Sequence, residues 1–310
     1  MTTYWSLEEI PQDFGPTAVT IGKFDGVHIG HVEIIHQLDD IAETRGLTAT
    51  VVTFDRHPAA LFRPEARPVE ITGMARRIEL IEQAGVQTNL VLPFTHELAA
   101  LSPREFVTRV LVHALHAQVV LVGHDFRFGS HAEGDVAQLR AFGVELGFDV
   151  VLIDDVSSVN GLRVSSSRIR LVMGEGDVEG ACALLGRMPA VRGTVVHGAK
   201  RGRELGYPTA NLSQEATGLI PADGVYAGWL TDAGVRYPAA ISVGSNPTFE
   251  GIHLRTVEAF VLDASLDLYG HVVVVEFAAR LRGMVAFAGI EALIEQMNAD
   301  VLDVRKVLAV

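Results

Sequence analysis

The chain has 310 residues and a formal net charge of −13 at pH 7, and hydrophobic residues make up 48% of it. The length fits about two domains, and the hydrophobic content supports packed cores and argues against global disorder. The acidic balance argues against a nucleic-acid binder with a broad basic face, although small anionic ligands need only a few local donors.

The cysteine content and the amino terminus bear on the compartment. The single cysteine, Cys182, excludes an intrachain disulfide and a multi-cysteine metal site, and it fits a reducing environment. The amino terminus lacks the basic start and apolar run of a signal peptide. No apolar run reaches the roughly 18–20 residues that a membrane-spanning helix needs. We therefore expect a cytoplasmic protein without membrane or nucleic-acid partners, and its oligomeric state stays open.

The first half of the chain alternates predicted strands with predicted helices. Apolar residues recur at helical spacing over residues 34–42 and 76–84. Ser102 begins a capping box with Pro103 at the first helical position, and Asp135 is expected to cap a further helix. The predicted strands cover residues 17–22, 49–54, 89–93, 119–122 and 149–153. This alternation predicts an α/β domain with a parallel sheet covered on both faces.

Strand-like runs dominate after about residue 186. They cover residues 191–197, 224–230, 237–243, 256–262 and 271–277, with Gly, Pro and Asn between them. That pattern predicts an antiparallel barrel or sandwich. An apolar stripe from Leu293 to Leu308 predicts a terminal helix. The bridge over residues 171–189 is partly helical and holds the boundary, which divides the chain into domains 1–186 and 187–310.

The stretch GKFDGVHIGH follows the first predicted strand, where open parallel sheets bind their ligands. Gly22, Gly26 and Gly30 let backbone N–H groups approach a ligand, and the start of the next helix suits a phosphate. His28 and His31 converge on one ligand if the helix begins between or just before them. They would then donate to phosphate oxygens as charge builds on a departing pyrophosphate.

Two other interpretations of this stretch remain. In the first, the stretch is a structural strand–turn–helix junction whose histidines have no function. In the second, it is a metal site. A metal site needs a third ligand, for which His57 and His124 are the candidates. The glycines favour phosphate over both alternatives.

A second cluster lies in the β-rich half. Residues 198–206 combine cations with glycines, which suits a polyphosphate, but their spacing is not that of a Walker A loop. Thr209 and Asn211 lie two residues apart, so on an extended segment both face the same side. A hydroxyl and an amide oxygen there can bind Mg²⁺ when phosphates supply further oxygens. The alternative is a turn with a Thr/Asn hydrogen bond.

The first motif, Phe24-Asp25-Gly26-Val27-His28-x-Gly30-His31, resembles the nucleotidyltransferase signature of bacterial FAD synthetases. Three later stretches agree in order, namely His57-Pro58, GHDFRFG at 123–129 and SSSRIR at 165–170. The resemblance implies ATP or phosphate contacts from Gly22, Phe24, Gly26, Gly30, Ser166, Ser167 and Arg170. It implies flavin contacts from His57, Pro58, Asp125, Phe126, Arg127 and Phe128. Ser166 or Ser167 is expected to cap a helix while Arg170 reaches a phosphate. Lys23 departs from the residue types expected at its position.

The second cluster resembles the riboflavin kinase signature. The resemblance continues through residues 221–227, 246–249, 256–260, 267–270 and 281–282. It implies that Glu258 is the catalytic base, and burial would raise the pKa of this carboxyl. It also implies phosphate contacts from Gly198, Lys200, Arg203 and Gly206, flavin contacts from Tyr226 and Arg282, and Mg²⁺ contacts from Thr209 and Asn211. An ordinary outward-facing strand residue is the alternative for Glu258. Apolar Met284, Val285 and Ala286 replace charged residues expected before Phe287.

Together the two signatures imply a bifunctional riboflavin kinase and FMN adenylyltransferase. The implied fold is an N-terminal Rossmann-like nucleotidyltransferase domain and a C-terminal, riboflavin kinase-like antiparallel β-barrel with a terminal helix. ATP would convert riboflavin to FMN and ADP, and a second ATP would convert FMN to FAD and pyrophosphate. Mg²⁺ is implied, and no permanently bound organic cofactor is expected. The rival hypotheses are a cytidylyl- or pantetheine-phosphate-type nucleotidyltransferase and a non-catalytic flavin or nucleotide sensor.

Overall fold

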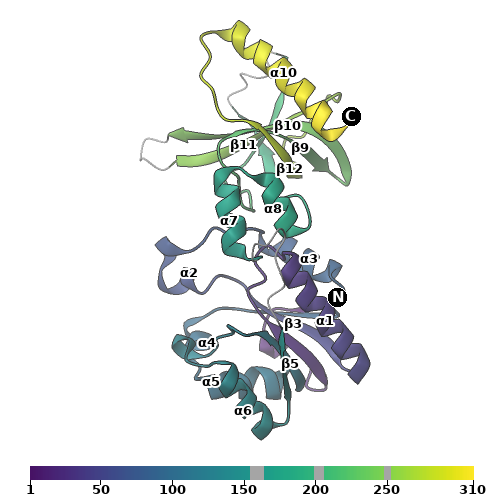
Figure 1. Cartoon of the computed structure of the whole chain (residues 1–310), viewed down its shortest axis with the longest axis vertical. Coiled ribbons are helices and arrows are strands. Elements are labelled where there is room, and N and C mark those ends of the chain that lie inside the picture. Colours follow the sequence, from purple (N-terminus) through teal and green to yellow (C-terminus); the bar gives the residue numbers. More distant parts are fainter. Residues whose placement is uncertain (154–163, 199–205, 248–252) are drawn as a thin grey trace. The chain divides into compact units, whose positions relative to one another are not determined.

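The structure, a computed structural model, describes residues 1–153, 164–198, 206–247 and 253–310 (Figure 1). The chain forms two compact units. Unit 1 comprises Met1–Val69 and Met74–Val164, and unit 2 comprises Glu70–Gly73 and Ser165–Val310. The predicted boundary between residues 186 and 187 lies later in the chain than this division.

Unit 1 contains a six-stranded, fully parallel sheet in the order β1-β4-β3-β2-β5-β6. Its strands are β1 (Thr2–Tyr4), β2 (Thr17–Ile21), β3 (Thr48–Phe54), β4 (Thr88–Leu92), β5 (Ala117–Gly123) and β6 (Asp149–Ile153). Its longer helices are α1 (Ile29–Arg45), α3 (Met74–Gln83), the π-helix η3 (Val107–Ala114) and α6 (Val136–Leu146). Short helical segments are η1 (Leu7–Glu9), α2 (Ala59–Phe62), η2 (Pro64–Ala66), α4 (His96–Ala100), α5 (Pro103–Phe106) and η4 (Ser130–Ala132).

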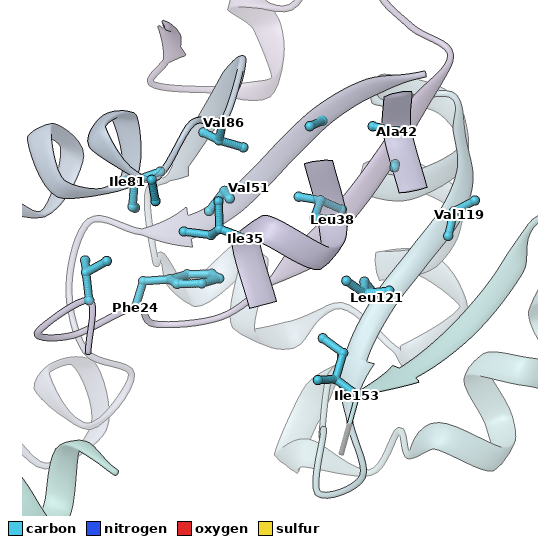
Figure 2. Close-up of a cluster of buried hydrophobic side chains, with 14 of the residues drawn as sticks. Phe24, Ile35, Leu38, Ala42, Val51, Ile81, Val86, Val119, Leu121 and Ile153 are labelled. Atoms are coloured by element: carbon cyan, nitrogen blue, oxygen red, sulfur yellow. The ribbon is translucent and has the colours of Figure 1, made fainter. Parts of the chain in front are cut away.

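Helices cover both faces of this sheet, as predicted. Neighbouring residues of β2 belong to opposite cores, because side chains alternate along a strand. Ala18 packs with Ile35 and Leu38 of α1, whereas Val19 packs with Val110 of η3. Figure 2 shows the first of these clusters between α1 and the strands. The predicted capping box at Ser102 and the cap at Asp135 are both confirmed.

Unit 2 begins with two helices, α7 (Ser166–Glu175) and α8 (Val178–Leu185). Main-chain and side-chain contacts bind them to the second half of the chain. Ala222 donates its N–H to the carbonyl of Met173, and Arg280 donates to the carbonyl of Glu175. Helix α8 packs against β12 (Val272–Arg282). These contacts explain why both helices group with the barrel.

The rest of unit 2 is a closed antiparallel barrel in the order β10-β11-β8-β7-β12-β9, which decides between the predicted barrel and sandwich. The remaining strands are β7 (Ala190–Val196), β8 (Thr209–Leu212), β9 (Gly224–Asp232), β10 (Val235–Pro247) and β11 (His253–Val261). Gly228 is required here, because a Cβ at this position would lie 2.0 Å from the carbonyl oxygen of Glu276. The terminal helix α10 (Ile290–Leu308) packs on β9, β10 and β12 (Figure 1).

Candidate active sites

The strand order of unit 1 locates a ligand-binding edge. From β2 the chain runs through α1 to β3 and β4 on one side, whereas β5 and β6 lie on the other side of β2. Ligands of parallel sheets bind at the carboxyl ends of the strands where the order reverses in this way. GKFDGVHIGH follows β2, and GHDFRFG overlaps the end of β5. The topology therefore places both predicted motifs at this switch point.

Helix α1 begins between the two histidines, as the phosphate hypothesis requires. His28 is the N-cap residue, and its Nδ1 accepts the N–H of His31 at 3.2 Å. Nδ1 therefore keeps its lone pair, and Nε2 is the nitrogen that carries a proton and can donate. The two rings stack with centroids 3.6 Å apart. This arrangement holds two imidazoles beside the positive end of α1, where an anion is stabilised.

The turn before α1 is fixed by burial and by unusual backbone angles. Phe24, Gly26 and Val27 have φ values of 47°, 87° and 37°. Phe24 is only 2% exposed, and its ring centroid lies 5.0 Å from that of His31. Figure 2 shows Phe24 beside Ile35, within the core. Its side chain thus packs against His31, and the ATP or phosphate contact predicted for Phe24 stays a prediction that only its main chain could fulfil.

The motif after β5 is partly core and partly exposed. Phe126 stacks on Phe128, which belongs to the core beneath the sheet. Asp125 and Arg127 are exposed, and Arg127 lies 3.9 Å from Asp135. A Cβ at Gly123 would lie 3.3 Å from the carboxylate of Asp125, a tight contact that a small shift of this exposed side chain would relieve. Phe126, Asp125 and Arg127 therefore remain candidates for ligand contact, whereas Phe128 has a packing role.

His57 and Pro58 follow β3 at the same sheet edge. Pro58 is the N-cap residue of α2, and His57 Nδ1 accepts the N–H of Ala59 at 3.0 Å. His57 Nε2 lies 3.2 Å from the Nζ of Lys23. The metal alternative gains no support, because the described ranges contain no group of three His, Cys, Asp or Glu side chains placed to hold an ion.

The cap of α7 differs from the prediction. Ser165, not Ser166 or Ser167, is the N-cap residue, and its hydroxyl accepts the N–H of Arg168 at 3.2 Å. The helix starts one or two residues earlier than expected because Ser165 is the residue with an extended backbone (φ −156°, ψ 154°). Ser166, Ser167 and Arg170 then lie in the first two turns of the helix.

Among the described residues of unit 2, two neighbouring cavities share Thr209 in their walls. The larger has a volume of about 550 Å³, and the smaller a volume of about 250 Å³. Gly198, Asn211 and Asp267 line the larger one, and Glu258 lines the smaller one. A donor bound in one cavity and an acceptor bound in the other would therefore meet at Thr209.

Thr209, Asn211 and Glu258 form one hydrogen-bonded group. Thr209 donates its hydroxyl to Glu258 Oε2 at 3.3 Å, and Asn211 Nδ2 donates to Thr209 Oγ1 at 3.0 Å. The register explains this contact, because Asn211 lies opposite Glu258 across β8 and β11. Val257 and Ala259 are buried, so alternation turns Glu258 to the other face of the strand. Glu258 thus faces away from the barrel interior and still lines a cavity.

The main chain at Gly198 lies against this group. A Cβ at Gly198 would approach Asn211 Oδ1 to 2.4 Å, so a larger residue there would displace the Asn211 side chain from its present position. Gly206 has a φ of 86°, which glycine adopts without strain. The predicted phosphate ligands Lys200 and Arg203 lie outside the described residues, as do Thr248 and Phe249 of the motif at 246–249.

The smaller cavity has an apolar wall and one buried ion pair. Its apolar lining includes Phe260, Met284, Val285, Phe287, Leu293, Met297 and Val301. Arg282 donates to both carboxylate oxygens of Asp300 at 2.8 and 2.7 Å, and Asp300 is only 5% exposed. Met284 and Val285 are 54% and 58% exposed. Met284 and Val285, which stand where charged residues were expected, thus give this cavity an apolar rim.

Tyr226 does not line either cavity. It is fully buried, packs edge-on against Phe277 and donates its hydroxyl to the carbonyl of Ala222. Burial raises the pKa of its phenol, so the group stays protonated and continues to donate. Its position indicates a role in the barrel core in place of the predicted flavin contact.

The sequence prediction missed the contribution of α10. Leu293, Met297 and Val301 were expected only as an apolar stripe, and Asp300 was not singled out. Asp300 lies beside the buried apolar stripe of this amphipathic helix. That position could have indicated a buried ion pair, because a buried carboxylate requires a partner.

Two family models match the chain. The model described as FAD synthetase covers residues 10–168, and the model described as riboflavin kinase covers residues 185–308. A bifunctional riboflavin kinase/FMN adenylyltransferase of Listeria monocytogenes is 35% identical over 94% of this chain and 92% of its own. One of Pseudomonas fluorescens is 39% identical, with the same coverage. The chain belongs to this bifunctional flavin-enzyme family.

A solved structure from Streptococcus pneumoniae, described as a macrolide-efflux protein, is 32% identical with a TM-score of 0.88 and covers 98% of both chains. The flavin-enzyme family matches agree with the two motif sets. His28 and His31 lie in the segment matched by FAD synthetase, and both barrel cavities lie in the segment matched by riboflavin kinase. In the described part of the chain, no helix has the length and apolar character required to cross a membrane.

Proposed function

We propose that residues 187–310 phosphorylate riboflavin and that residues 1–186 adenylylate the FMN formed. The observation that carries the kinase assignment is the position of Thr209 in both cavity walls, beside Glu258. ATP occupies the larger cavity and the flavin ring occupies the smaller, apolar one. Phosphoryl transfer between them requires that the acceptor hydroxyl lie beside Glu258.

In the kinase reaction, Glu258 accepts the proton of the terminal ribityl hydroxyl as its oxygen attacks the γ-phosphorus of ATP. The bond from that phosphorus to the β–γ bridging oxygen breaks, and ADP leaves. Thr209 donates to Glu258 in the free protein, which holds the carboxylate in position. Asn211 orients Thr209 in turn.

The donor set fits a hard cation. Thr209 Oγ1 and Asn211 Oδ1 are neutral oxygens, and Gly198 lets the main chain approach Asn211 closely. Thr209 and Asn211 would hold Mg²⁺ together with phosphate oxygens of ATP. When bound, the ion would neutralise the negative charge that develops on the phosphates.

In the adenylyltransferase reaction, a phosphate oxygen of FMN attacks the α-phosphorus of ATP, and pyrophosphate leaves. An ionised phosphate is already a nucleophile, so no general base is required. His28 and His31 donate to the developing charge at the start of α1. Ser166 and Arg170 of α7 are proposed to bind the polyphosphate, and Asp125, Phe126 and Arg127 are proposed to contact the flavin. The substrates and the single cysteine fit a cytoplasmic enzyme.

Chromatography of flavins tests this assignment. The wild-type chain, incubated with riboflavin, ATP and Mg²⁺, should form FMN and then FAD. Glu258→Gln should lower FMN formation by about 10²- to 10⁴-fold, the usual contribution of a general base, and should still convert supplied FMN to FAD. Glu276→Gln is the matched control, because Glu276 pairs with Arg236 on β10 and lines neither cavity.

Three results would contradict the assignment. Loss of both activities in folded Glu258→Gln would refute the division into two sites. A folded, ATP-binding wild-type chain that converts neither flavin would favour the sensor. Transfer to a pantetheine phosphate or of a cytidylyl group, without flavin turnover, would favour another nucleotidyltransferase.

A further inference from the structure

Tyr207 makes a polar contact beside the smaller cavity that the proposed kinase reaction does not use. Its side chain lines that cavity, and its hydroxyl donates to Asn298 Oδ1 of α10 at 2.6 Å. Asn298 is exposed and lines neither cavity. The hydrogen bond therefore joins a cavity wall to the outer part of α10, between two residues that lie 91 positions apart in the chain.

The neighbours of Tyr207 restrict the position of its hydroxyl. Gly206 has a φ of 86°, which sets the turn before Tyr207, and a residue that precedes a proline, here Pro208, favours an extended backbone. The ring of Tyr207 packs edge-on against Phe260 of β11, with centroids 5.0 Å apart and planes inclined by 62°. Phe260 in turn pairs with Thr209 across β8 and β11. Main-chain and ring contacts together therefore direct the hydroxyl toward α10.

The segment 207–209 contributes to the walls of both cavities. Tyr207 lines the smaller cavity, Pro208 lines the larger one, and Thr209 lines both. Helix α10 forms another part of the smaller cavity through Met297 and Val301. The bond from Tyr207 to α10 therefore connects two walls of the same cavity. Movement of α10 away from the segment would break this bond and widen the smaller cavity at the same time.

We propose that the hydrogen bond from Tyr207 to Asn298 holds α10 against the segment 207–209, and that Tyr207 is a positioning residue for riboflavin. The bond acts on the width of the smaller cavity and not on the reacting atoms. It therefore sets the affinity for riboflavin and leaves the chemical step unchanged. The role belongs to the hydroxyl, because a phenylalanine ring would fill the same part of the wall. The inference rests on the proposed assignment of the flavin to the smaller cavity.

Steady-state kinetics of riboflavin phosphorylation provide the first test. Tyr207→Phe keeps the ring and removes only the hydroxyl, and the KM for riboflavin should rise by about 2- to 10-fold, the range expected for one neutral hydrogen bond. The kcat and the KM for ATP should change little. Tyr237→Phe, on β10 and outside both cavity walls, is the matched control and should leave all three constants unchanged. An unchanged KM for riboflavin in Tyr207→Phe overturns the proposal.

A double-mutant cycle tests the partner, with riboflavin fluorescence titrated in the presence of ADP and Mg²⁺ so that binding is measured without turnover. Asn298→Leu removes the acceptor and should weaken riboflavin binding as much as Tyr207→Phe does, and the double variant should lose no more than either. Asn298→Asp keeps an acceptor oxygen and should bind riboflavin as the wild type does.

Additive losses in the double variant overturn the proposal, because they show that the two side chains act independently. The same titration separates this inference from the proposed kinase reaction. A chain that phosphorylates no riboflavin, but binds it more weakly in both single variants without additivity, would support the role of Tyr207 while refuting the reaction.

Discussion

Asn89 lies on β4, between β1 and β3 of the parallel sheet, with no exposed surface. It pairs with Val51 on β3 and Thr3 on β1, and its side chain points to the same face as Val51. Within the described chain, neither its amide nitrogen nor its carbonyl oxygen has a hydrogen-bond partner. Burial of such a group without partners costs about 1–3 kcal/mol in proteins. The buried amide of Asn89 therefore lowers the stability of the sheet, at a position remote from the motifs that follow β2 and β5.

Replacing Asn89 by leucine, which has a similar volume, should stabilise the protein by about 1–3 kcal/mol because no polar group is then buried unpaired. Urea denaturation followed by circular dichroism measures the change. Asn89→Asp is the matched control, and it should destabilise the protein because a buried charge is costlier than a buried amide. A loss of stability in Asn89→Leu would show that the amide is hydrogen-bonded in solution and would refute the prediction.

At the scale of elements, α10 is tied to the end of β12 by the bidentate pair of Arg282 and Asp300. Gln296 adds a third hydrogen bond, to Asp300 Oδ1 at 3.0 Å. Because α10 also contributes Met297 and Val301 to the smaller cavity, this pair positions one wall of the proposed flavin site. Helix docking and riboflavin binding should therefore depend on the same carboxylate.

Asp300→Asn should destabilise the barrel unit by about 3 kcal/mol, because it leaves a half-buried guanidinium without its counter-charge. The KM for riboflavin should rise, with little change in the KM for ATP. Thermal unfolding and kinase kinetics measure the two effects. Asp303→Asn, an exposed position on the same helix, should change neither. A rise in the KM for ATP alone would contradict the assignment of the flavin to the smaller cavity.

Elements with a regular pattern were predicted from the sequence, and those defined by tertiary contacts were not. The pattern of β2 and α1 identified both, because buried strands and amphipathic helices repeat at different periods. The three-residue strand β1 has no such repeat and exists only through its pairing with β4. The N-cap of α7 at Ser165 depended on which of three consecutive serines has an extended backbone. Glu258 and Thr209 were identified by resemblance, whereas their contact follows from the register of β8 and β11.

For the whole molecule, the two barrel cavities are lined only by residues of unit 2. The proposed kinase site therefore needs no side chain from the proposed donors at His28 and His31. We expect the two reactions to be separable by mutation, and FMN made by one molecule to serve as substrate for another.

A mixture of Glu258→Gln and His28→Ala proteins should convert riboflavin to FAD, although each variant alone should not. The first supplies the adenylyltransferase and the second supplies the kinase. Chromatography over time should show free FMN rising before FAD. If the mixture accumulates FMN and forms no FAD, while Glu258→Gln alone adenylylates supplied FMN, then released FMN is not the intermediate that the second site uses.

The place of Thr209 between two cavities has a consequence for the order of events in the kinase. If ATP and riboflavin bind in the two cavities as proposed, both can be bound at the same time, and we expect direct phosphoryl transfer without a phosphorylated protein intermediate. Double-reciprocal plots should therefore intersect instead of running parallel. Because the proposed nucleotide and flavin sites are separate cavities, we expect ADP to depart while FMN is still bound.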